Sequence, residues 1–200
     1  MRKISPRSAL LAVILAALSA CAAPAYVSPV EVTRFVGQSD KFLAQGTIAI
    51  EPAPGIAADS LEYGFYSEAV RIALERLGYR VVAQNGSQIA ILGFAESTGR
   101  AGSQRGPVNV GVGGSTGSYG SGLGVGIGLD LTPRPADEIS TFMTIAIRAS
   151  QGGTNLWEGR AAMTATVNSD FAPSDARAGK LADALFADFP GNSGETVIVQ

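Results

Sequence analysis

The sequence predicts an α+β fold: a largely antiparallel sheet, two helices packed on one face of it, and a glycine-rich insert. Three observations lead to this prediction. Two segments carry apolar residues at helical spacing, several shorter runs have β-type composition, and one stretch is dominated by glycine. The chain has 200 residues, of which 46% are hydrophobic and 16% charged. That size and composition suit one modest domain with its own hydrophobic core.

Runs of β-type composition predict the strands. They are expected at 30–36, 46–50, 79–83, 89–95, 139–149 and 156–167. The last two form a predicted hairpin through the turn at 151–154. Alternation puts one set of side chains on its buried face, namely Met143, Ile145, Ile147, Ala149, Trp157, Ala161, Met163, Ala165 and Val167. The residues predicted to face away are Glu158, Arg160, Thr164 and Thr166. The run 196–199 is expected either to add an edge strand or to end free.

Two helices are predicted between these strands. Asp59 is the expected N-cap of the first, with Glu62 as its capping-box partner, and Gly78 is placed to end it. Its expected apolar stripe contains Leu61, Phe65, Tyr66, Ala69, Val70, Ala73, Leu74 and Leu77. The second helix is expected over 173–189, ended by Pro190. Its predicted buried stripe contains Ala178, Leu181, Ala182, Leu185, Phe186 and Phe189.

The glycine-rich insert is predicted over 99–131. Apolar residues alternate near both of its ends, which predicts two β-prone arms joined by a flexible glycine-and-serine tip over 113–122. Three interpretations are open: a long loop or hairpin without a partner, an arm for strand addition or self-association, and a phosphate cradle. The last lacks its motifs, because neither G-x-G-x-x-G nor a Walker A sequence is present.

The N-terminus carries the sequence feature most specific to a function. Three basic residues precede the apolar run 9–18, which is too short to span a bilayer and is typical of a signal peptide. The run leads directly into Leu18, Ser19, Ala20 and Cys21, which resemble the lipobox of bacterial lipoproteins. The resemblance implies cleavage after residue 20, a diacylglyceryl thioether on the Cys21 sulfur and an acyl chain on its new amine. The alternative is an ordinary cysteine just after a conventional cleavage site.

Processing at that point defines the expected domain organisation. Residues 1–20 are a signal peptide, 21–30 a lipidated tether, 31–190 the domain and 191–200 a tail. Removal of residues 1–20 leaves 12 basic and 17 acidic residues, a formal charge of −5. The second mature residue is Ala22 rather than aspartate, which in the sorting pattern of such lipoproteins implies the outer membrane. We therefore expect an outer-membrane lipoprotein whose domain faces the periplasm.

The composition argues against several other classes of protein. The nearly balanced charge, 15 basic against 17 acidic residues, offers no basic face for nucleic acid. The chain has no histidine and only one cysteine, so it lacks the commonest metal ligands and catalytic bases. No metal, cofactor or catalytic residue is therefore predicted. A G-x-S-x-G match at 113–117 lies in low-complexity sequence and lacks the histidine that such hydrolases use. Carboxylates such as Asp137, Glu138, Asp183 and Asp188 are expected to be solvated surface groups.

The order of several short motifs resembles the bacterial lipoprotein family called domain of unknown function 4136 (DUF4136). The residues that carry the resemblance are the helix end at 74–79, the strand at 88–95, the segment 155–161 and the final Phe189-Pro190. The resemblance implies a compact α+β domain and supplies no catalytic residues. The expected function is a non-enzymatic structural or assembly partner in the cell envelope. The alternatives are a module that binds a small apolar or lipidic ligand between the helices and the sheet, and an enzyme of unknown type.

Overall fold

The computed structural model describes residues 23–38, 40–100, 108–117, 120–129 and 135–200. The chain divides into two compact units. One contains residues 25–100 and 137–200 and is called the sheet domain below. The strands described in the other unit form a hairpin from the glycine-rich insert.

The sheet domain is built on a seven-stranded sheet in the order β3-β2-β4-β7-β8-β1-β9. The strands are β1 (Val30–Val36), β2 (Thr47–Pro52), β3 (Arg80–Val82), β4 (Gln88–Gly99), β7 (Glu138–Ala149), β8 (Asn155–Thr166) and β9 (Thr196–Val199). Strand β2 pairs in parallel with both β3 and β4, and the other pairings are antiparallel. The parallel pairings follow from the helix after β2, because a crossover helix returns the chain in the same direction. The predicted mixed α+β class with two helices is therefore confirmed.

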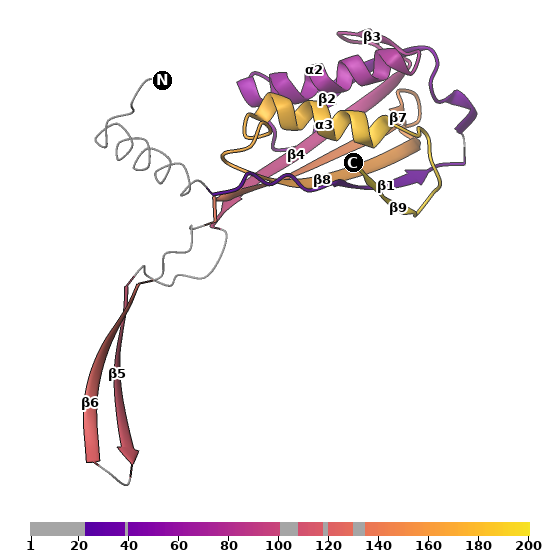
Figure 1. Cartoon of the computed structure of the whole chain (residues 1–200). Coiled ribbons are helices and arrows are strands. Elements are labelled where there is room, and N and C mark those ends of the chain that lie inside the picture. Colours follow the sequence, from indigo (N-terminus) through magenta and orange to yellow (C-terminus); the bar gives the residue numbers. More distant parts are fainter. Residues whose placement is uncertain (1–22, 39, 101–107, 118–119, 130–134) are drawn as a thin grey trace, which may run out of the picture. The chain divides into compact units, whose positions relative to one another are not determined.

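Two helices, α2 (Leu61–Arg76) and α3 (Ser174–Phe186), lie on the same side of this sheet, as Figure 1 shows. The predicted N-cap of α2 is wrong by one residue. The cap is Ser60, whose Oγ accepts the Tyr63 N–H at 3.1 Å. Gly78 ends the helix as predicted, with φ of 102°, a left-handed conformation that favours glycine. A short 3-10 helix, η2 (Asp40–Phe42), was not predicted.

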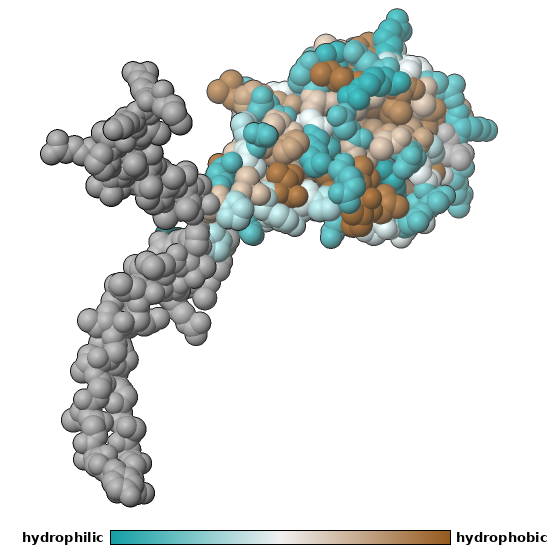
Figure 2. Space-filling view, viewed as in Figure 1, coloured by the Kyte–Doolittle hydropathy of each residue, from teal (hydrophilic) through white to brown (hydrophobic). Residues whose placement is uncertain are grey.

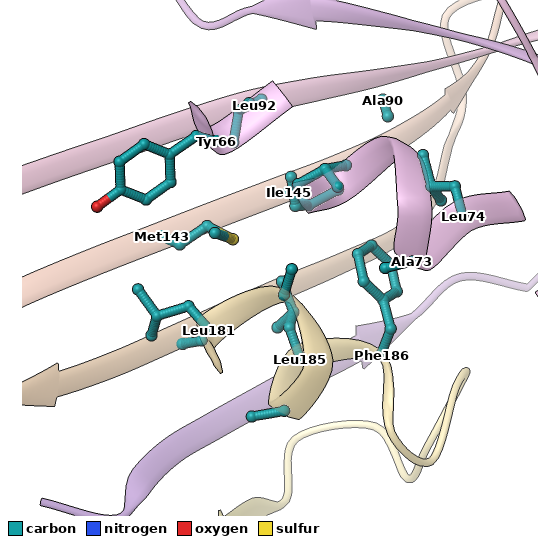
Figure 3. Packing of buried hydrophobic residues seen from close by; sticks show 14 of the residues in the cluster. Tyr66, Ala73, Leu74, Ala90, Leu92, Met143, Ile145, Leu181, Leu185 and Phe186 are labelled. Carbon is teal, nitrogen blue, oxygen red and sulfur yellow. The ribbon is translucent and has the colours of Figure 1, made fainter. Parts of the chain in front are cut away.

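The core lies between the helices and the sheet. Figure 3 shows side chains of α2 and α3 meeting those of β4 and β7, including Leu74, Leu92, Ile145 and Leu185. The predicted stripe of α2 is too broad: Leu61 is 84% exposed and Phe65 46% exposed. The buried face contains Tyr63, Tyr66, Val70, Ala73 and Leu74. The predicted stripe therefore includes apolar residues from two sides of α2, only one of which packs against the sheet.

The predicted hairpin of β7 and β8 is present, with one irregularity near the turn. The register shifts between Ile147 and Arg148, so that the consecutive residues Leu156 and Trp157 are both buried. The far end of β8 also departs from the predicted alternation. Val167 is 46% exposed, whereas Thr166 is buried because the N-terminal segment covers it.

That N-terminal segment runs along β8 before β1 begins. Thr166 N–H donates to the Tyr26 carbonyl, Val27 bridges Ala165, and Ser28 N–H donates to the Thr164 carbonyl at 2.8 Å. The Ser28 hydroxyl also accepts the Thr164 N–H, and the next residue, Pro29, has no N–H to donate. The chain is therefore fixed to the sheet from Tyr26 onward. At the other terminus, β9 pairs with β1 as the edge strand, one of the two outcomes expected for 196–199.

The described part of the glycine-rich insert forms strands β5 (Val108–Gly117) and β6 (Gly120–Leu129). They pair antiparallel from Val108↔Leu129 to Gly117↔Gly120. Two β-type arms were predicted, but the tip predicted at 113–122 is too long, because Gly113–Gly117 and Gly120–Gly122 belong to the strands. The G-x-S-x-G match lies within β5, which is not the strand–turn–helix elbow that this motif forms in hydrolases.

Candidate functional site

The residues of the predicted lipidation site, Leu18, Ser19, Ala20 and Cys21, lie outside the described residues. The structure does describe the chain shortly after them. It reaches the sheet domain at Tyr26, five residues after Cys21. Tyr26 also lines an open groove of about 660 Å³. This groove is the candidate functional site.

The floor of the groove is a row of side chains that crosses five strands on the sheet face opposite the helices. Strand register aligns its members one beside the next: Ala95 with Phe142, Phe142 with Ala162, Ala162 with Glu31, and Glu31 with Ile198. Successive residues of a strand point to opposite faces, so this row alternates with core residues such as Met143 and Val32. Phe142 is 42% exposed and Ile198 is 56% exposed. The small side chains of Ala95, at the end of the row, and of Ala162, between Phe142 and Glu31, leave the hollow.

Hydroxyl groups form the neighbouring row. Ser97 pairs with Ser140, and Ser140 pairs with Thr164, whose hydroxyl oxygens lie 3.2 Å apart. Ser28 and Tyr26 of the N-terminal segment line the same side of the groove. The groove therefore offers hydrogen-bonding groups along one side and apolar surface along the other.

The charges that line the groove are all negative. Glu31, Glu96 and Glu138 line it, and no lysine or arginine does. Glu96 is engaged in an ion pair behind the groove. Glu31 and Glu138 take part in none of the ion pairs found among the described residues, whose carboxylates are Glu68, Glu75, Glu96, Glu158 and Asp183. Two carboxylates in the groove are therefore available to a ligand.

A buried polar cluster lies behind the groove, between strand β4 and the helices. Arg177 of α3 is 2% exposed and donates to Glu96 Oε2 at 2.7 Å, while Tyr66 of α2 donates to Glu96 Oε1 at 2.7 Å. Burial acts to raise the pKa of Glu96, but the hydrogen bonds from Arg177 and Tyr66 outweigh it and hold that pKa below its ordinary value. Burial and the bond to Glu96 raise the pKa of the Tyr66 hydroxyl. The cluster ties β4 to both helices and keeps Glu96 ionised.

A second buried arginine fixes the C-terminal end of α3. Arg34 of β1 donates from Nε to the Leu185 carbonyl at 3.0 Å and from Nη2 to the Ala184 carbonyl at 2.9 Å. Burial lowers the pKa of Arg34, and Asp188 and Glu195 oppose that effect. A cation at the carbonyl end of a helix is favourable because the peptide dipoles leave that end negative. This contact could not be predicted from the sequence, because a charged residue within a strand is ordinarily expected at the surface.

Other features of the described residues bear on chemistry. No helix among them is long and apolar enough to cross a membrane. Within the same described part of the chain, no group of three or more acidic, cysteine or histidine side chains is placed to hold a metal ion. Asp183 is a surface group as expected, paired with Arg76 at 2.7 Å. The space between helices and sheet, where a ligand was considered, is filled by side chains that include Trp157 stacked on Phe186.

Sequence reasoning did not single out the groove. Its residues come from the N-terminal segment and five strands, and only strand order and register bring them together. One signal was available: Ser140, Phe142 and Thr144 form the second face of a strand whose first face is apolar. A single exposed aromatic residue is common on protein surfaces, so this signal alone does not identify a binding site.

Neither a protein-family model nor a curated protein sequence matches the chain. Solved structures do resemble it in three dimensions. One is a PDZ domain protein from Parabacteroides distasonis, with 14% identity, a TM-score of 0.48, and coverage of 98% of this chain and 43% of that one. Another is the PelC dodecamer from Paraburkholderia phytofirmans, with 11% identity, a TM-score of 0.40, and coverage of 79% and 95%. The chain thus spans less than half the length of the PDZ domain protein.

Proposed function

We propose that this protein is a bacterial lipoprotein that holds the sheet domain at the outer membrane, facing the periplasm, as a non-enzymatic assembly partner. The observation that carries the proposal is the sequence Leu18-Ser19-Ala20-Cys21 directly after a short apolar run. A thioether-linked diacylglyceryl group together with an amide-linked acyl chain exceeds the two hydrophobic signals that stable anchoring needs. The likeness of the motifs at 74–79 and 155–161 to the DUF4136 family supports the same assignment.

The distance from the anchor to the domain supports a role at the membrane surface. Tyr26 is already hydrogen-bonded to β8, and five residues separate it from Cys21. An extended chain spans at most about 3.6 Å per residue, so the lipidated residue lies within ~18 Å of Tyr26. Because Tyr26 also lines the groove, that part of the groove would be held close to the bilayer. A partner bound there would be held close to the membrane.

The finer architecture is part of the same proposal. We assign a largely antiparallel sheet and a glycine-rich insert over 99–131 to this lipoprotein domain. The antiparallel pairings of β1, β4, β7, β8 and β9 and the hairpin of β5 and β6 support this assignment.

A second candidate function is the binding of a small apolar or lipidic ligand. It is favoured by one observation, the groove of about 660 Å³, which falls within the usual range of ligand sites, roughly 300–1,000 Å³. Its negative lining argues against anionic lipids as the ligand.

The lipid anchor is tested by metabolic labelling of cells with a clickable fatty-acid analogue. The native chain is expected to be labelled and to fractionate with the outer membrane, and Cys21→Ser is expected to lose both properties. The matched control is Ser19→Ala, which keeps the small residue that the lipobox requires. Label on the Cys21→Ser chain, or a free thiol at Cys21 in the mature native protein, would contradict the proposal.

A further inference from the structure

We propose that the groove binds a short, extended peptide segment of a partner protein, and that the segment carries basic side chains beside an apolar one. This inference rests on the proposed role as an assembly partner but not on the lipid anchor. Each property of the expected segment follows from a separate feature of the groove.

The positive charge of the segment follows from the lining. Glu31 and Glu138 have no ion-pair partner among the described residues, and the groove is lined by no lysine or arginine. A cationic side chain would be attracted by both carboxylates and repelled by nothing in the lining. Complementary charge of this kind steers encounter and excludes acidic partners.

The apolar side chain of the segment follows from the hollow. In the row, Ala162 lies between Phe142 on one side and Glu31 on the other, so the space over its small side chain is bordered by an aromatic ring and a carboxylate. Ile198 follows Glu31 on the next strand. Phe142 and Ile198 are about half exposed, and an apolar side chain placed over Ala162 would remove part of this surface from water.

The extended shape of the segment follows from the spacing of the groups. Glu138 lies four residues from Phe142 along β7, about 13 Å at the rise of a strand. Glu31 lies two strands from β7, about 10 Å across the sheet. The two carboxylates are therefore ~16 Å apart, which matches basic residues about four positions apart in an extended peptide, given the reach of a lysine side chain. The hydroxyls of Ser140 and Thr164 lie between them and can bond to a peptide backbone.

The test measures fluorescence anisotropy of a labelled hexapeptide with lysine at positions 1 and 5, leucine at position 3 and serine elsewhere, so that the basic and apolar side chains share one face of the extended chain. The peptide is titrated with the full chain purified in a non-ionic detergent. Micelles without protein give the background. Saturable binding above that background is expected, and it should weaken when sodium chloride rises from 0.05 to about 0.5 M, because salt screens exposed charges. A glutamate–leucine hexapeptide is expected not to bind.

Variants locate the site. Replacement of both groove carboxylates, Glu31→Gln with Glu138→Gln, is expected to weaken binding roughly fivefold, the order typical of exposed charge pairs. Ala162→Leu fills the hollow and is expected to weaken binding roughly tenfold, equivalent to about 1.4 kcal/mol. The matched controls are Glu51→Gln, an exposed carboxylate outside the groove, and Ala146→Leu, two rows away on the same face; both are expected to bind as the native chain does.

The inference is overturned if the glutamate–leucine peptide binds equally well, if no saturable binding exceeds the micelle background, or if the carboxylate variant binds normally. Circular dichroism shows whether each variant is folded. The carboxylate variant changes no core residue and is expected to fold. It therefore still tests the inference if Ala162→Leu does not fold. Fatty-acid labelling of Cys21 reports separately on the anchor, so failure of one proposal is distinguishable from failure of the other.

Discussion

The two faces of one sheet differ in what their side chains do. On the face covered by α2 and α3, residues such as Leu92, Met143 and Ile145 are fully buried. On the opposite face, Phe35, Phe142 and Ile198 remain between 41% and 56% exposed among hydroxyl and charged groups. The same strands form both faces, because successive residues of a strand point to opposite sides of the sheet. The covered face therefore carries the stability of the domain, and the open face can bind a partner at little cost to folding.

The space-filling view shows how mixed the surface of the domain is. Hydrophobic and hydrophilic residues alternate in small patches on the side that Figure 2 displays. The outward side of α2 contributes Leu61, Phe65 and Ile72 to the exposed apolar residues of the domain. Scattered apolar residues are ordinary on protein surfaces, so they do not by themselves identify a binding site. The groove is distinguished by its hollow and its charge.

The largest expected effect tests the covered face at its largest buried side chain. Trp157 is 1% exposed, stacks against Phe186 with ring centroids 5.4 Å apart, and donates from Nε1 to the Pro190 carbonyl at 2.8 Å. Trp157→Ala is expected to lower the free energy of unfolding by about 3–5 kcal/mol, because it leaves a cavity and an unpaired carbonyl. Urea denaturation followed by circular dichroism measures this loss. Trp157→Phe should recover much of it, and a loss below about 1 kcal/mol would show that this face is not the stabilising one.

A smaller loss is expected at the polar cluster that joins β4 to the helices. Glu96→Gln removes the charge that Arg177 and Tyr66 contact, and we expect a loss of about 2 kcal/mol, typical of hydrogen bonds to charged groups. Because the folded pKa of Glu96 lies below its ordinary value of 4.5, its contribution is fully present above pH 4.5. That contribution disappears as pH falls through the folded pKa.

The measurement is the free energy of unfolding of both chains between pH 7 and pH 3. The difference between native and Glu96→Gln is expected to be constant down to about pH 4.5 and to shrink below it. Glu51→Gln, on an exposed carboxylate of β2, serves as the control. A difference that instead grew on acidification would mean that Glu96 is protonated in the folded protein.

An effect of about 1 kcal/mol is expected at the start of α2. Ser60 Oγ accepts the Tyr63 N–H, so Ser60→Ala should destabilise the domain by about that amount, whereas Asp59→Ala should have little effect. Thermal unfolding of the two variants separates the cap from its neighbour. The result also bears on the comparison of the two faces, because it separates the stability that the helix cap contributes from the stability that the packed core beneath the helix contributes. Equal losses from both variants would contradict the assignment of the cap.

The local features of the fold were predictable because short-range rules decide them. Gly78 ends α2 because a left-handed residue is needed there, and the β7–β8 hairpin follows from alternation around a glycine-containing turn. The cap was misplaced because Asp59 and Ser60 are both good N-caps and only the geometry chooses between them. The parallel pairing of β2 was missed because it depends on where α2 crosses the sheet.

Long-range features lay beyond sequence reasoning for a different reason. The burial of Arg34 and Arg177 depends on carbonyl and carboxylate partners from other elements, up to 151 residues away in the case of Arg34. The groove needs five strands in the correct order before Ala95 and Ile198 lie in one row. The proposed lipidation motif at Cys21 can be predicted from the sequence because such a motif is a short local pattern of residues. A binding face, in contrast, exists only after folding.

The smallest expected effect compares adjacent residues on the two faces of β7. Phe142→Thr replaces a half-exposed ring with a β-branched residue that suits a strand, so the free energy of unfolding should fall by about 0.5 kcal/mol or less. Met143→Ala, one position further, is expected to cost about 2–5 kcal/mol because Met143 is fully buried. Urea denaturation of the two variants measures both losses in the free energy of unfolding, so that they can be compared. If Phe142→Thr were as costly as Met143→Ala, the open face would be part of the stabilising core, and the groove could not exchange its exposed surface for a partner without disturbing the fold.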